Sequence, residues 1–273
     1  MKKIDKRLQN LKNILLDMQG VLIAYSGGLD STFLVKVAHD VLGDKVLAVT
    51  AVSAAYPAQE VKAAKDLIRK LKVRHIIIKT KELSSQKFIA NTKHRCYWCK
   101  QELFSELKSL AKKHKLNYVL DGANYEDTKD FRPGMKAAQE LGVRSPLKEV
   151  GLDKAGIRYL SRKLNLSTWD KASFACLASR FPYGVKINKK DLNTVDKAES
   201  FLRNLGFSQV RVRHHGRTAR IELEKQQMSK ILSEPLRKKI VSCFKKLGYL
   251  YVSFDLEGYR TGSMNEPLKK HKV

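Results

Sequence analysis

The residues best suited to chemistry in this sequence form the hexapeptide Ser-Gly-Gly-Leu-Asp-Ser that begins at Ser26, between a short apolar run and an amphipathic one. Gly27 and Gly28 let the backbone approach a phosphate without a Cβ in the way, and the first N–H groups of a following helix point at the anion. Ser31 adds a second hydroxyl donor, and Asp30 is suited to holding the Mg²⁺ that accompanies a nucleotide. The hexapeptide therefore predicts a site for the phosphates of ATP.

Other phosphate-binding loops are excluded by reading the chain. No G-x-x-x-x-G-K-[ST] segment is present, and no G-x-G-x-x-G follows a predicted strand. The hexapeptide instead resembles the pyrophosphate loop, or PP-loop, of the ATP pyrophosphatase superfamily. The resemblance implies an enzyme that cleaves ATP between the α and β phosphates and adenylates a carboxylate or carbonyl oxygen. We assign Gly122, which follows a later predicted strand, to the same ATP site.

The four cysteines offer a second kind of chemistry. Cys96 and Cys99 form C-x-x-C at the start of a predicted helix, where both thiols share one face and can bind a single metal or cluster. Cys176 stands alone, and Cys243 lies in an amphipathic helix as an expected core thiol. A zinc site lacks further ligands, and a redox dithiol, although open as an alternative, does not explain the ATP loop. Three thiolates suit a [4Fe-4S] cluster with one iron open to an exogenous sulfide.

Strands and helices alternate through the first half of the chain, a pattern typical of a doubly wound parallel sheet. The expected strands are Val21–Tyr25, Val46–Thr50, His75–Lys79 and Tyr118–Asp121, and the expected helices begin at Thr32 and lie near Ala58–Leu71 and Tyr97–His114. Ligands of such sheets bind beyond the carboxyl ends of the strands. We therefore expect one crevice, lined by Ser26–Ser31, Thr50–Ser53, a loop over Thr80–Cys99 and Gly122–Asp127.

Past Leu166 the pattern changes and predicts a second, smaller α+β domain. Its expected elements are a helix near Leu192–Leu205, strands Gln209–His214 and Thr218–Leu223, a helix near Leu236–Leu247 and a strand Tyr249–Phe254. We place an ATP pyrophosphatase domain over residues 1–170, a junction that contains Cys176 over 171–186, and the small domain over 187–273.

Composition agrees with an enzyme of the cytoplasm. The chain has 273 residues, and neither a signal peptide nor an apolar run long enough to span a bilayer is recognisable, so we expect no membrane partner. The formal net charge of +27 is carried mostly by lysines spread through every segment, which favours a solvated surface over a nucleic-acid site. An exposed strand edge in the small domain would suit a homo-oligomer.

Motifs along the whole chain resemble the LarE family of ATP-dependent sulfur transferases. Beside the PP-loop, these are His94–Lys100, Asp121–Asn124, Arg132–Gly134, Gly142–Leu147, Ala175–Gly184, Leu205–Phe207 and Arg211–Gly216. The resemblance implies adenylation of a carboxylate on pyridinium-3,5-biscarboxylate mononucleotide, a small-molecule substrate. Sulfur insertion then gives a thiocarboxylate, on the route to the nickel-pincer cofactor of lactate racemase and related enzymes. The sequence does not identify the sulfur donor.

The LarE family divides by its cysteines. Members with only the junction cysteine are thought to sacrifice it, so that the equivalent Cys176 would attack the adenylate and be left as dehydroalanine. Members with two further cysteines are thought to use a cluster. This chain has Cys96 and Cys99 as well and is similar to the second group, which implies a [4Fe-4S] cluster held by all three thiolates.

The mononucleotide substrate implied by the resemblance needs a phosphate site. Arg211 and Arg213 alternate on a predicted strand and so place both guanidinium groups on one face, although a pair of solvated strand arginines is an equal alternative. Ser179 and Arg180, beside Cys176, are expected to bind the same substrate. Glu199 would orient groups or accept a proton in catalysis, unless it is a surface helix glutamate. Trp98, His214 and His215 receive no chemical role.

Other classes of protein share some of these features. A tRNA thiolase would also combine a PP-loop, clustered cysteines and basic charge, but no RNA-binding appendage is recognisable. An amide-forming PP-loop ligase would not need three cysteines. A nucleotide-binding regulator would bind ATP without the carboxylate-dependent exchange of pyrophosphate that marks the enzymes.

Overall fold

The computed structural model describes residues 2–129, 133–172 and 175–268. Arg132 of the predicted motifs and residues 173 and 174 of the predicted junction lie outside this part of the chain. The chain divides into two compact units, which we describe separately. The N-terminal unit comprises Met1–Ser53, Ala58–Glu82 and His94–Phe174, and the C-terminal unit comprises Ala54–Pro57, Leu83–Lys93 and Ala175–Val273.

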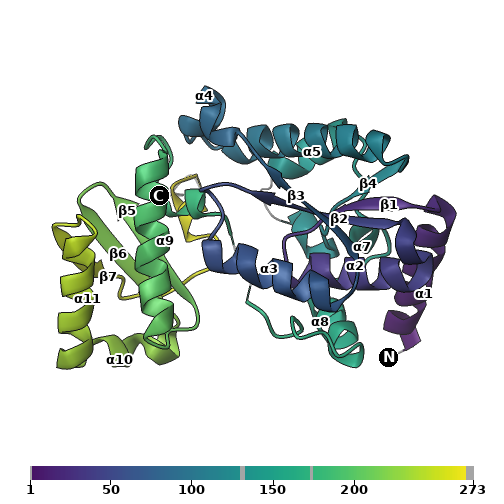
Figure 1. The fold of residues 1–273 in the computed structure, drawn as a ribbon. Coiled ribbons are helices and arrows are strands. Elements are labelled where there is room, and N and C mark those ends of the chain that lie inside the picture. The colour runs from purple at the N-terminus through teal and green to yellow at the C-terminus, as the bar shows by residue number, and fades with distance from the viewer. Residues whose placement is uncertain (1, 130–132, 173–174, 269–273) are drawn as a thin grey trace. The chain divides into compact units, whose positions relative to one another are not determined.

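A four-stranded parallel sheet forms the centre of the N-terminal unit, with the strand order β3-β2-β1-β4 (Figure 1). Its strands are β1 (Val21–Ala24), β2 (Val46–Val52), β3 (Arg74–Lys79) and β4 (Tyr118–Leu120). Its helices are α1 (Lys2–Met18), α2 (Leu29–Leu42), α3 (Ala58–Lys70), α5 (Arg95–Lys113), α6 (Pro133–Glu140), α7 (Pro146–Glu149) and α8 (Lys154–Lys163). The sheet and its flanking helices confirm the predicted doubly wound α/β class.

Both faces of the parallel sheet are covered, which explains why its central strands read as continuous apolar runs. One core joins the sheet to α1, α2, α3 and α8 through side chains such as Leu15, Phe33 and Ile157. The other core joins it to α5 and α6 through Leu103, Phe104 and Leu107 among others. Because strands β1 and β2 lie side by side in register, their carboxyl ends reach the same edge of the sheet.

The C-terminal unit is built on a three-stranded mixed sheet with the order β5-β6-β7. Strands β5 (Val210–His215) and β6 (Thr218–Leu223) form an antiparallel hairpin, whereas β7 (Tyr251–Phe254) runs parallel to β6. Its helices are α4 (Gln86–Ile89), α9 (Lys189–Asn204), α10 (Met228–Ile231) and α11 (Glu234–Lys246). The structure thus confirms the smaller α+β unit.

Successive side chains of β5 point to opposite faces of the sheet, so Val210 and Val212 lie on one face and Arg211 and Arg213 on the other. Val210 and Val212 belong to an apolar core that also contains Leu202 of α9 and Phe244 of α11. Cys243 packs against that core while staying half-buried, and burial raises the pKa of its thiol, as expected for a structural cysteine.

The Thr80–Cys99 segment is not the single loop that the sequence predicted. It contains a short 3₁₀ turn at Glu82–Ser84, helix α4, and the first turn of α5. The four residues of α4 are too few to show a helical period, so the sequence pattern could not reveal this helix. In the described part of the chain, none of the helices combines the length and the apolar character needed to cross a bilayer.

Candidate active site

The predicted PP-loop lies between the end of β1 and the start of α2. The hydroxyls of Ser26 and Ser31 are 3.1 Å apart, and the main-chain N–H of Ser26 donates to Ser31 Oγ over 3.3 Å. The N–H of Gly28 in turn donates to Ser26 Oγ over 3.3 Å. Asp30 lies in the first turn of α2, beside these hydroxyls in the chain. The loop therefore closes on itself through the two serines and presents the start of a helix, which suits an anion.

Two glycines lie where the loop approaches its neighbours closely. Gly27 has φ +71°, and a Cβ there would lie 2.5 Å from the Cβ of Ala64 on α3. Gly122, after β4, approaches α2 so closely that a Cβ would lie 3.1 Å from the N atom of Ser31. Any side chain at Gly27 would push the loop away from α3, so both backbone freedom and close packing demand glycine there.

Side chains of β2 and β3 support the loop from the sheet. Thr50 Oγ1 donates to the carbonyl oxygen of Tyr25 over 2.9 Å, and His75 Nε2 lies 2.9 Å from the same hydroxyl. Burial raises the pKa of Tyr25 to about 12, and burial together with the nearby Lys65 lowers the pKa of His75. The supporting layer is therefore uncharged at neutral pH.

The cysteine pair of the N-terminal unit lies in the first turn of α5. Cys96 is exposed, Cys99 is half-buried, and Trp98 between them is half-buried against Tyr97. Because they are three residues apart in a helix, the two cysteines lie on one side of α5. Within the described residues, no group of three or more His, Cys, Asp or Glu side chains is gathered as a ready-made metal site.

Cys176, in the C-terminal unit, immediately precedes a 3₁₀ turn at Leu177–Arg180. Its carbonyl oxygen accepts hydrogen bonds from Ser179 Oγ over 2.9 Å and from Arg180 Nη1 over 3.1 Å. The same Arg180 nitrogen donates to the carbonyl oxygen of Ala175 over 2.9 Å. The backbone that carries Cys176 is thus held by the arginine of its own motif.

Arg180 and Glu199 form a bidentate ion pair in the interior of the C-terminal unit. Nε donates to Oε1 over 2.8 Å and Nη2 to Oε2 over 2.9 Å. Glu199 also accepts from Arg203 over 2.7 Å and from the N–H of Val212 over 3.0 Å. Burial would raise the pKa of Glu199, but the charge and hydrogen bonds of Arg180, with Arg211 and Arg203, outweigh it and hold this pKa below its usual value.

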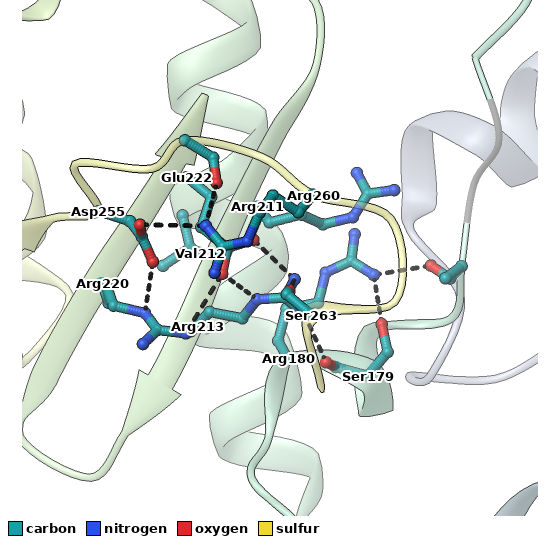
Figure 2. Close-up of polar contacts among 12 residues, drawn as sticks. Ser179, Arg180, Arg211, Val212, Arg213, Arg220, Glu222, Asp255, Arg260 and Ser263 are labelled. Atoms are coloured by element: carbon teal, nitrogen blue, oxygen red, sulfur yellow. Dashed lines mark hydrogen bonds and ion pairs between the residues drawn. The ribbon is translucent and has the colours of Figure 1, made fainter. Parts of the chain in front are cut away.

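Arg213 makes a second bidentate pair, with Glu222 of β6 (Figure 2). Nε and Nη2 donate to the carboxylate over 2.8 Å and 2.6 Å. The remaining contacts of Arg213 reach the carbonyl oxygen of Ser179 over 2.8 Å and the hydroxyl of Ser263 over 2.9 Å. Since Ser179 Oγ also accepts from Arg180, this serine connects the two ion pairs.

Arg211, like Arg213, lies on β5, and its side chain is buried, with 3% of the residue exposed. Its Nη1 donates to the carbonyl oxygen of Val210 over 2.9 Å, and its guanidinium lies 5.1 Å from the ring centroid of Tyr259. Burial, followed by repulsion from Arg180, lowers the pKa of Arg211 to about 10. A bound anion would stabilise the charged form of Arg211, because it would replace the hydration lost on burial and offset the positive charge of Arg180.

These observations overturn two of the structural alternatives considered for the sequence. Arg211 and Arg213 are buried at 3% and 4% exposure, so they are not solvated strand arginines. Glu199 has no exposed surface, so it is not a surface helix glutamate. The sequence analysis missed Glu222 and Ser263. Glu222 could have been found as the acidic residue of the strand that follows the two arginines in the chain.

Comparisons with known proteins agree with this architecture. The NAD synthase family matches residues 3–105. An uncharacterized protein of Synechocystis is 42% identical over 267 residues, which cover 98% of this chain and 100% of that protein. The pyridinium-3,5-bisthiocarboxylic acid mononucleotide synthase of Lactiplantibacillus plantarum is 38% identical over 260 residues, 95% of this chain and 94% of the synthase. One subunit of the glutamine-hydrolyzing GMP synthase of Saccharolobus solfataricus is 28% identical over 140 residues, 50% of this chain and 37% of that subunit.

The Ser-Gly-Gly-Leu-Asp-Ser loop follows β1 of a parallel sheet, and the N-terminal part of the chain matches NAD synthases. Together these features define a PP-loop protein that uses ATP. The likeness to the Lactiplantibacillus synthase extends over both units and nearly the full length of both chains. The chain belongs to the family of this synthase, the LarE family.

Proposed function

We propose that this protein is an ATP-dependent, AMP-forming sulfurtransferase. It adenylates a carboxylate of pyridinium-3,5-biscarboxylate mononucleotide and replaces the adenylate by sulfur, giving a thiocarboxylate for nickel-pincer cofactor biosynthesis. The observation that carries the proposal is the 38% identity to a synthase of the bisthiocarboxylic mononucleotide over 95% of this chain. The PP-loop between β1 and α2 supplies the structural element that the adenylation requires.

The first step joins the substrate carboxylate to the α phosphorus of ATP. A carboxylate oxygen attacks, the bond from the α phosphorus to the bridging oxygen breaks, and its electron pair leaves with pyrophosphate. The N–H groups at the start of α2 and the hydroxyls of Ser26 and Ser31 bind the pyrophosphate portion, with Gly122 packed against them. Asp30, in the first turn of α2, would hold Mg²⁺.

The second step transfers sulfur to the acyl carbon. A sulfur nucleophile attacks the adenylate, and AMP leaves with the electron pair of the acyl–oxygen bond, so that a thiocarboxylate remains. We propose that Cys96, Cys99 and Cys176 ligate a [4Fe-4S] cluster. When bound, such a cluster offers an iron site open to an exogenous sulfide. The residues suit this role because Cys96 and Cys99 lie three residues apart, on one side of α5 near its N-terminus.

The substrate phosphate is assigned to Arg211 and Arg213, with Ser179. Burial and the pKa of Arg211, lowered to about 10, support this assignment, since phosphate would compensate an unfavourably buried cation. Arg180 and Glu199 are proposed as positioning residues that hold the backbone of Cys176. The N-terminal unit would then bind ATP and the C-terminal unit the mononucleotide, which are the roles expected for the domains over residues 1–170 and 187–273.

We also propose that the protein is a homo-oligomer. Strand β7 lies at the edge of its sheet, and Tyr251 on it is 66% exposed. Such an edge can pair with another copy of the chain. Light scattering that gives the mass of a single chain across the working concentration range would contradict this.

The function is tested by supplying the purified protein with ATP, Mg²⁺, a sulfide source and the biscarboxylate mononucleotide. We expect AMP, pyrophosphate and a thiocarboxylate product. Asp30→Ala should abolish all three while the fold is retained, whereas Asp44→Ala, at an exposed aspartate, should change none of them. Formation of ADP and orthophosphate would contradict the proposal.

The cluster is tested by anaerobic purification followed by absorption spectroscopy and iron and sulfide counts. Replacing Cys96, Cys99 or Cys176 by Ser should remove the cluster absorption and the sulfur transfer but leave ATP–pyrophosphate exchange intact. Cys243→Ser serves as the matched control and should do neither. If the Cys96→Ser/Cys99→Ser variant still makes product once per chain, and Cys176 is found as dehydroalanine, the protein sacrifices that cysteine and the cluster is not the donor.

A further inference from the structure

Lys171, a residue to which nothing above assigns a role, contacts the PP-loop. Its Nζ donates to the carbonyl oxygen of Gly27 over 3.0 Å and lies 2.8 Å from Glu60 Oε2 on α3. The side chains of Lys171 and Glu60 are 20% and 19% exposed, so the pair is shielded but still reachable. All three residues belong to the N-terminal unit.

The backbone that carries Lys171 is fixed from α8. Arg158 donates through Nη1 to the carbonyl oxygen of Trp169 over 2.7 Å and through Nη2 to that of Lys171 over 3.0 Å. One turn further along α8, the guanidinium of Arg162 lies 5.0 Å from the ring centroid of Trp169. Two arginines of one helix therefore hold the segment in the position from which Lys171 reaches the loop.

The position of Lys171 beside the PP-loop suits the negative charge of the ATP phosphates. The hexapeptide that begins at Ser26 contains no lysine or arginine, yet a bound triphosphate is strongly anionic. Mg²⁺ at Asp30 would offset part of that charge. Further negative charge develops on the bridging oxygen as pyrophosphate departs, and a cation next to the loop would stabilise it.

We propose that Lys171 is a pyrophosphate ligand of this site. In the absence of nucleotide its ammonium is held by Gly27 and by Glu60, which acts as its counter-ion. When ATP binds, the ammonium moves to the β and γ phosphate oxygens and stays with pyrophosphate as the bond to the α phosphorus breaks. This inference rests on the proposed function, because it assumes that ATP is cleaved to AMP and pyrophosphate.

The experiment measures the affinities of three variants for ATP, pyrophosphate and AMP by calorimetry in the presence of Mg²⁺. Lys171→Met should weaken ATP and pyrophosphate binding by about 10- to 100-fold, the range for a lost charge-assisted hydrogen bond, while AMP binding changes little. Glu60→Gln leaves the ammonium in place without its counter-ion and should bind pyrophosphate as tightly as the wild type or more tightly. Lys62→Met, at an exposed lysine of the same helix, is the matched control and should behave as the wild type.

The same measurements can overturn the inference. If Lys171→Met and Glu60→Gln weaken all three ligands equally, the pair only holds the loop in shape and Lys171 is not a phosphate ligand. Unchanged pyrophosphate affinity in Lys171→Met would also overturn it. Should Lys171→Met fail to fold, Lys171→Arg retains the cation and is expected to keep most of the pyrophosphate affinity. A wild-type protein that binds neither ATP nor pyrophosphate would overturn the proposed function and this inference with it.

Discussion

The guanidinium of Arg180 and the carboxylate of Glu199 meet through two parallel hydrogen bonds of 2.8 Å and 2.9 Å, and neither side chain has any exposed surface. A pair so completely removed from water is costly to break on one side only, because the remaining charge stays buried. The pair also links α9 to the 3₁₀ turn that follows Cys176. Stability and the position of the cysteine therefore depend on the same contact.

We predict that Arg180→Met lowers the free energy of unfolding by about 3–5 kcal/mol, since it leaves Glu199 buried without its main partner. Urea denaturation followed by circular dichroism measures the change. The double variant Arg180→Met/Glu199→Leu should recover a large part of the loss, because it removes the orphaned charge as well. A double variant no more stable than Arg180→Met would show that the cost lies in packing and not in charge.

Gly27→Ala should impair ATP binding and destabilise the N-terminal unit. The new Cβ would meet Ala64 at 2.5 Å, in addition to the strain of φ +71°. Gly142→Ala is the matched control, because Gly142 has φ +68° but nothing within 4 Å of the new Cβ. We expect about 1 kcal/mol for the control, the cost of backbone strain alone, and a larger loss for Gly27→Ala. Equal losses would mean that contact with α3 does not constrain the loop.

Substitutions of Arg211 and Arg213 should have different effects on the stability of the protein. Arg213→Ala leaves Glu222 buried without its bidentate partner and should cost about 3–5 kcal/mol of unfolding free energy. Arg211→Ala removes a buried cation that Arg180 repels, but that cation also favours the charged form of Glu199, so we expect a smaller loss of stability than for Arg213→Ala. It should nevertheless weaken substrate binding by about 1–3 kcal/mol with ATP binding unchanged. Titration with the substrate and with ATP, beside a urea melt, distinguishes the two; equal weakening of both ligands by Arg211→Ala would contradict the assignment.

The protein should lose stability in mild acid partly through His214. The ring of this residue packs at a tilt against that of Phe181, and its Nδ1 lies 3.1 Å from the hydroxyl of Tyr249. Burial lowers the pKa of His214 more than the nearby Asp191 raises it. Below about pH 6.5 the unfolded state therefore takes up a proton that the folded state resists. The free energy of unfolding decreases as the pH is lowered.

Urea melts between pH 7.5 and pH 5 measure that slope. His214→Phe keeps a ring beside Phe181 and should flatten it. Because partial burial and the charge of Arg220 also lower the pKa of His215, the double variant with His215→Gln should flatten the slope further. An unchanged slope in both variants would place the acid sensitivity elsewhere.

The sequence predicted those parts of the fold that depend on local pattern. Val21–Ala24 and Val46–Val52 are mostly apolar and mostly buried, and such runs need no knowledge of distant residues to be recognised. The PP-loop was found in the same way, since its glycines and hydroxyls are adjacent in the chain. Helix α4 was missed because Gln86–Ile89 is shorter than two helical turns.

The remainder of the site depends on partners far apart in the chain. Arg213 is buried because Glu222, Ser179 and Ser263 surround it, and these lie 9, 34 and 50 residues away. Alternation on a strand could place Arg211 and Arg213 on one face, but it could not show that this face is covered. For the same reason the contact of Lys171 with Gly27, 144 residues earlier, leaves no trace in any local motif.

The C-terminal unit includes two segments from the first half of the chain, residues 54–57 and 83–93, which are synthesised before the rest of the unit. Asn91, fully buried, donates to the carbonyl oxygens of Pro182 at 2.8 Å and Val185 at 3.0 Å, and the N–H of Leu177 donates to the carbonyl oxygen of Ala55 over 2.8 Å. During synthesis, residues 54–57 and 83–93 must wait for about a hundred later residues before these hydrogen bonds can form. A fragment beginning at residue 175 would lack them altogether. The C-terminal unit is therefore not one continuous stretch of chain, and a deletion or fusion that cuts the gene at residue 175 would remove part of it.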